Sequence, residues 1–138
     1  MRKAIPLLLL VATSITVIVG ASACQSGPPP TTVDEGAVRA YADPATEVTL
    51  QGFSENDLAK YTQYGNAGFK AAVTQEILDR AATQVGSQLG TYESKEFLRA
   101  EEQEGYVIVH YRATYARNKV GVRMVFDSEH LVAGHFFE

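Results

Sequence analysis

The sequence predicts an α+β domain in which N-terminal helices pack on a four-stranded antiparallel meander sheet. Two observations lead to this prediction. Apolar residues recur at helical spacing up to Leu89, and from Thr91 onward the hydrophobic period changes to two. Helices followed by a run of strands favour a sheet with all its helices on one face.

The first 23 residues have the parts of a secretory signal peptide. Arg2 and Lys3 form a basic start, and the apolar segment 7–19 follows. That segment is shorter than the about 20 apolar residues that span a membrane as a helix. We therefore expect residues 1–23 to be removed. Residues 21–23, Ala-Ser-Ala, also fit an ordinary signal peptidase, and cleavage there would give a secreted protein.

Cys24 is the single cysteine and follows Gly20-Ala21-Ser22-Ala23. This context resembles the lipobox of bacterial lipoproteins, in which the cysteine receives a diacylglycerol and becomes the first mature residue. Ala21 departs from the pattern, which usually has a bulky aliphatic residue there. A lone thiol in an exported chain has no disulfide partner. We expect a protein anchored through lipid on Cys24, outside a bacterial membrane in the cell envelope.

Residues 24–42 are interpreted as a linker. Pro28, Pro29 and Pro30 favour an extended polyproline path that does not join a sheet. We expect a stalk up to about Tyr41 and a folded unit over residues 43–138. Without Arg2 and Lys3, ten basic residues face sixteen acidic ones. No basic cluster is present, so nucleic acid is not an expected partner.

Local signals place the helices. Asp43 and Pro44 predict the start of the first helix, as an N-cap followed by proline at the first position. A short helical piece is expected at about 55–64, and the glycine-rich segment 65–68 ends it. Thr74 predicts the start of the clearest helix, and Gly90 predicts its end.

Alternation of apolar and polar residues predicts four strands at 92–102, 106–116, 120–127 and 131–137. Two-residue turns would pair Tyr115 with Val120 and Phe126 with Leu131. This register turns one apolar set toward the helices, and a one-residue slip would invert it. The inward set is Val107, Val109, Tyr111, Ala113, Tyr115, Val122, Met124, Phe126, Leu131, Ala133, His135 and Phe137.

Several of these features together are similar to one family. They are residues 52–57, Leu89-Gly90, residues 106–111 and 122–127, and the closing strand 131–137. The pattern resembles a domain of unknown function, family number 3887, that is common in bacterial surface lipoproteins and is placed in the nuclear-transport-factor-two-like (cystatin-like) superfamily. Ala59 departs from it, since an aromatic residue is frequent there. The resemblance implies a cone-shaped α+β fold and hardly any chemistry.

In that superfamily the mouth of the cone can bind a small apolar molecule. Here the resemblance implies Tyr61, Tyr111, Tyr115 and His135 as the polar groups of such a cavity. A concave apolar site with a few polar groups is typical of ligand binding, although aromatic residues on an inner face are usually core. A small apolar ligand carrier is the alternative function.

An isomerase-like enzyme would need Asp57 beside Tyr61, or His135 beside Tyr111. The sequence contains no serine elbow, no phosphate loop and no metal-binding spacing of Cys and His. We expect no catalytic residue, no metal and no cofactor.

The second face of the sheet would be exposed. In the predicted register Arg112 lies opposite Arg123, a repulsive pair unless a carboxylate lies between them. The apolar members of this face are Tyr106, Ile108, Val125, Val132 and Phe136. Exposed apolar patches often mark protein contacts, unless the N-terminal segment covers this face. We therefore expect a non-catalytic binding or interaction module whose partner is a second copy or another envelope protein.

Overall fold

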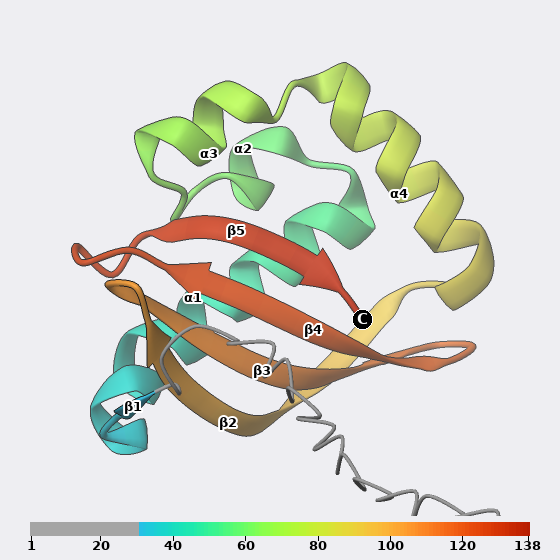
Figure 1. The fold of residues 1–138 in the computed structure, drawn as a ribbon. Helices are drawn as coiled ribbons and strands as arrows, with labels where there is room; N and C mark the ends of the chain where they lie inside the picture. Colours follow the sequence, from blue (N-terminus) through green and yellow to red (C-terminus); the bar gives the residue numbers. More distant parts are fainter. Residues whose placement is uncertain (1–30) are drawn as a thin grey trace, which may run out of the picture.

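A computed structural model describes residues 31–138 as helices on one side of a twisted antiparallel sheet (Figure 1). The expectations for the signal peptide, for Cys24 and for residues 25–30 lie outside the described residues. The helices are α1 (Glu35–Glu55), α2 (Leu58–Tyr61), α3 (Ala67–Ala72) and α4 (Gln75–Leu89). The strands are β1 (Thr31–Thr32), β2 (Tyr92–Gln103), β3 (Tyr106–Tyr115), β4 (Lys119–Phe126) and β5 (Val132–Phe137).

The predicted α+β class is confirmed, but within residues 31–138 the sheet has five strands, in the order β1-β2-β3-β4-β5. The additional strand comes from the expected linker, where Thr31 pairs with Glu102 and Thr32 with Glu101. Proline lacks the N–H that a sheet requires. The two threonines that follow Pro30 keep theirs and are β-branched, which favours strand. The expectation that the linker would not join the sheet is therefore wrong at Thr31 and Thr32.

The N-cap of helix α1 lies nine residues before the predicted N-cap Asp43. Asp34 is its N-cap, and its Oδ1 accepts the backbone N–H groups of Gly36 at 2.9 Å and Ala37 at 3.2 Å. Pro44 lies inside the helix, where proline costs about 3 kcal/mol. The helix continues through it because the preceding turns bury Val38 and Ala42 in the core.

The segment between α1 and α4 contains more helix than predicted. Asp57 caps α2 by accepting the Lys60 N–H at 3.0 Å. Asn66 caps α3 by accepting the Phe69 N–H at 2.8 Å, so residues 65–68 start a helix where only a break was expected. Helix α4 is confirmed, with Thr74 as its N-cap and Gly90 at its end with φ 78°.

All four predicted strands are confirmed, but the register of the last three differs by two residues up to the irregularity in β5 and by one beyond it, where Phe126 pairs with Val132. Val120 pairs with Ala113, and Met124 pairs with His135. A slip of two preserves the face of every side chain. The pairing of Arg112 with Arg123 is wrong, because Arg112 pairs with Gly121 and Arg123 with His110.

Strand β5 contains one irregularity that changes a face. Val125 pairs with Gly134 but Phe126 pairs with Val132, so Ala133 is an extra residue. The bulge turns the side chain of Val132 into the core, where it is fully buried. Val132 therefore does not belong to the outer face, contrary to the prediction.

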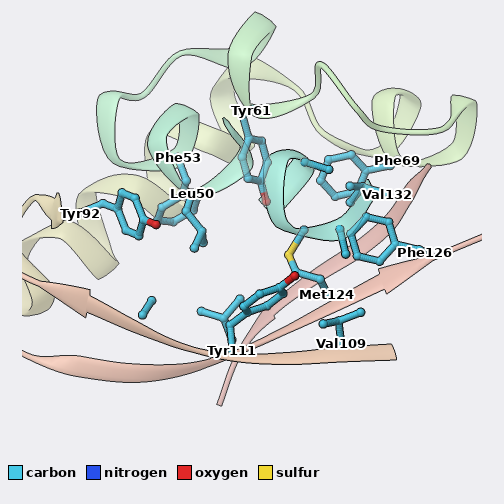
Figure 2. Close-up of a cluster of buried hydrophobic side chains, with 14 of the residues drawn as sticks. Leu50, Phe53, Tyr61, Phe69, Tyr92, Val109, Tyr111, Met124, Phe126 and Val132 are labelled. Atoms are coloured by element: carbon cyan, nitrogen blue, oxygen red, sulfur yellow. The ribbon is translucent and has the colours of Figure 1, made fainter. Parts of the chain in front are cut away.

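The core lies between the sheet and α1, with α2 and α3 above it (Figure 2). Leu50 of α1 points toward the sheet (Figure 2), and the ring of Phe53, also from α1, packs against that of Phe137 on β5. Within residues 31–138, no helix is long and apolar enough to cross a membrane.

Candidate functional site

The structure brings Tyr61 and His135 together on the inner side of the sheet. Tyr61 ends α2 and His135 lies on β5, and the Tyr61 hydroxyl lies 3.1 Å from His135 Nδ1. The Phe53 ring packs against both, with centroid distances of 5.7 Å to Tyr61 and 5.8 Å to His135. The ring of Phe137 lies 4.7 Å from that of His135. The pair is therefore a polar contact inside an aromatic cluster.

Burial fixes the charge of this pair. It lowers the pKa of His135 to about 4, because the imidazolium would lose its hydration. The same effect raises the pKa of Tyr61 to about 12. Both groups are neutral near pH 7. The Nε2 atom of His135 is buried and has no hydrogen-bond partner among the described residues.

The other two predicted cavity residues have different environments. The Tyr115 hydroxyl is buried without a hydrogen-bond partner in the described part of the chain. Burial, and to a smaller extent the nearby Tyr61, raises the pKa of Tyr115. The Tyr111 hydroxyl donates to Asp43 Oδ1 of α1 at 2.9 Å. Tyr111 is thus connected to α1, and it is Tyr61 that lies beside His135.

The three tyrosines are part of the packed core, and His135 is partly buried beside them. Tyr61, Tyr111 and Tyr115 are each less than 10% exposed, and Asp57 is occupied as the cap of α2. An open hollow is found instead on the outer face of the sheet. It has a volume of about 210 Å³ and is lined by Tyr106, Val125, Ala133, Gly134 and Phe136.

The hollow exists because of the sequence of β5. Gly134 has no side chain, and the Phe136 ring lies 2.8 Å from the position that a Cβ atom on Gly134 would take. Phe136 is 47% exposed and Tyr106 is 45% exposed. Val125 is half-buried between them. Three of the residues predicted for an interaction face therefore surround one depression, and Ile108 is half-buried on the same face.

Charged side chains continue this outer face beyond the hollow. The Arg123 guanidinium lies over the Phe136 ring at 4.8 Å from its centroid, and its Nε lies 3.5 Å from Glu138 Oε1. His110 is held between two carboxylates, 3.4 Å from Glu101 and 3.3 Å from Glu138. This network was not predicted, because it depends on the register, which brings Glu101, His110 and Arg123 of three neighbouring strands close to one another.

Arg112 is exposed on this face and forms no ion pair among residues 31–138. The same part of the chain contains no group of three His, Cys, Asp or Glu side chains that could hold a metal ion.

Comparison with known proteins shows the family of this chain. No curated protein and no solved structure matches the chain. The match is to a family model that covers residues 46–134, from the buried face of α1 to the bulged part of β5. The chain therefore belongs to the family described as protein of unknown function (DUF3887).

Proposed function

We propose that this protein is a lipid-anchored, extracytoplasmic interaction module that binds a partner through the outer face of its sheet. The observation that carries the proposal is the open hollow between Tyr106 and Phe136, on the face that the helices leave uncovered. Antiparallel sheets usually turn a polar face to water, and exposed aromatic residues around a depression are typical of binding surfaces. The module has no catalytic role in this proposal.

The anchor would be lipid on Cys24, followed by a short tether. Because strand β1 starts at Thr31, only residues 25–30 separate the anchor from the sheet. Such a segment spans at most about 25 Å. The domain would stay close to the membrane surface, on a tether much shorter than a stalk that reached Tyr41. A partner in the same membrane, or at its surface, would be within reach of the domain.

A small-ligand carrier of the cone-shaped, nuclear-transport-factor-two-like type is the second candidate. The observation in its favour is the pair of buried polar atoms without partners, His135 Nε2 and the Tyr115 hydroxyl. Buried polar atoms normally have a hydrogen-bond partner, so a polar group on a small, otherwise apolar ligand would satisfy them. This function requires α2 or β5 to move, because Tyr61 is only 7% exposed.

In-cell photo-crosslinking tests the proposed surface. A photo-reactive amino acid replaces Phe136 in one version of the full chain and Ile77 of α4 in the control. Both positions are large, apolar and 47% exposed. We expect a discrete adduct in the membrane fraction from position 136 and none from position 77. Equal adduct patterns from both positions would refute a specific role of the outer face.

The anchor is tested separately. Replacement of Cys24 by alanine should move the folded protein out of the membrane fraction and abolish incorporation of labelled palmitate. Retention of Cys24→Ala in the membrane fraction would contradict lipid anchoring and leave the crosslinking result as an independent measurement.

A further inference from the structure

We infer that the partner bound at the outer face is an extended acidic segment of another protein that carries one aromatic or aliphatic side chain. This inference rests on the proposed function and adds the chemistry of the partner. It follows from the distribution of charge on the molecule, from the hollow, and from the size of the face.

The outer face differs in charge from the rest of the chain. By strand register, four cations and three carboxylates point outward from β2 to β5 and the residue after β5. They are Arg99, Arg112, Lys119, Arg123, Glu96, Glu101 and Glu138. The remaining described residues hold six cations and thirteen carboxylates. This face therefore carries a formal charge of +1, whereas the remaining described residues together carry -7, and the face would attract acidic partners.

Two of these cations are available for a partner. Glu101 and Glu138 are occupied by Arg99, Arg123 and His110. Arg112 and Lys119 are exposed and form no ion pair within residues 31–138. Glu96 pairs with Arg112 across β2 and β3 in the ladder, but the two form no ion pair. Both free cations lie toward the far end of the sheet from the hollow.

The hollow and the free cations define the shape of the partner. Tyr106 and Arg112 lie six residues apart on β3, which is about 20 Å at 3.3 Å per residue. An extended segment of about six residues spans this distance. One of its side chains would occupy the hollow of about 210 Å³, and carboxylates farther along would reach Arg112 and Lys119. Aromatic anchors in pockets commonly dominate such interfaces.

A second copy fits this face less well. Strands β2 to β5, at about 4.8 Å spacing and about eight residues long, cover a flat area of about 500 Å². Stable interfaces bury about 800 Å² on each partner. A symmetric dimer would also bring the cations of both copies to the same interface. A short peptide needs less area and supplies the opposite charge.

The test uses the mature chain with Cys24→Ser, labelled with nitrogen-15, and three synthetic peptides of about eight residues. One peptide is rich in Asp and Glu around a central Phe, the second has Lys in place of the acidic residues, and the third has Ala in place of Phe. We expect the acidic Phe peptide to shift the amide resonances of Tyr106, Val125, Phe136 and Arg112. The Lys peptide and the Ala peptide should each bind at least about tenfold more weakly than the acidic Phe peptide.

Matched variants locate the charge effect. Lys119→Glu should weaken binding of the acidic Phe peptide by about tenfold, and added salt should reduce the difference. Lys70→Glu makes the same charge change on α3, where Lys70 is also exposed, and should leave the affinity unchanged. Equal effects of the two variants would overturn the inference.

Other outcomes would also overturn the inference. In the peptide titrations these are tighter binding of the Lys peptide than of the acidic Phe peptide, resonance shifts confined to the helices, or no shift with any peptide. Binding of this face to vesicles with anionic lipid, or resonance broadening that depends on protein concentration alone, would point to a different occupant. If crosslinking at position 136 captures a partner while the acidic peptide fails, the face remains the interaction surface and only the acidic chemistry is wrong.

Discussion

The buried histidine makes a prediction that can be worked out from the structure. His135 is neutral in the folded protein because burial lowers its pKa to about 4, whereas the pKa in the unfolded chain is about 6.5. Between these values the unfolded chain binds a proton that the folded protein does not. The free energy of unfolding should therefore fall as the pH is lowered through this range.

The size of the effect follows from the two pKa values. At pH well above 6.5, His135 is unprotonated in both the folded and the unfolded state, so it does not lower the free energy of unfolding. Between about pH 7 and pH 5 the linkage relation gives a loss of about 2 kcal/mol, and the total reaches about 3 kcal/mol below pH 4. Carboxylates such as Asp127 have a lowered pKa, so their stabilising contribution is lost only at lower pH, below about 4.

Urea denaturation at pH 7 and pH 5 measures this difference. In His135→Gln, the change in the free energy of unfolding between pH 7 and pH 5 should be smaller than in the wild type by about 2 kcal/mol. In His110→Gln, where the substitution lies on the opposite face of the sheet, the part of this change that comes from His135 should remain. The imidazole resonances of the wild-type protein give a direct value that needs no variant. A titration midpoint of His135 near 6.5 would refute the burial argument, as would an unchanged pH dependence in folded His135→Gln.

Three further predictions concern stability and are checked by urea denaturation. Gly52→Ala should destabilise the protein by more than about 2 kcal/mol, because the added Cβ would lie 2.3 Å from the backbone nitrogen of Tyr61. Gly86→Ala on α4 places its Cβ in open space and should stabilise the protein by about 0.5–1 kcal/mol. If Gly52→Ala were tolerated, α1 and α2 would not be in close contact. Asn66→Ala should cost about 1–2 kcal/mol, because it removes the cap of α3 and a 2.9 Å hydrogen bond to Asp127, and a loss below about 0.3 kcal/mol would contradict this.

Elements with local signals at both ends could be predicted from the sequence. Helix α4 has Thr74 as a cap and Gly90 as a terminator, and both act where expected. The start of α1 could not be predicted this way. Pro44 is a strong local signal for a helix start, but the burial of Val38 and Ala42 against the sheet outweighs it. Burial of that kind depends on tertiary packing, which a local pattern does not contain.

The candidate site shows the same division. Alternation placed His135 on the inner face and Phe136 on the outer face, and the two-residue register difference did not change either. Contacts between strands could not be predicted, because each depends on the register itself. Arg123 therefore lies opposite His110, and the bulge at Ala133 turned Val132 inward.

The two faces of the sheet differ in how their polar groups are used, and this difference decides where binding is expected. On the inner face the hydroxyl of Tyr111 is paired with Asp43, and that of Tyr61 with His135. The Tyr115 hydroxyl and His135 Nε2 have no partner among the described residues, but a ligand would have to displace core side chains to reach them. On the outer face, Phe136 is half-exposed beside an open hollow, and Arg112 has no ion-pair partner among the described residues. A partner gains contacts on the outer face without breaking any in the core, so binding there costs less reorganisation.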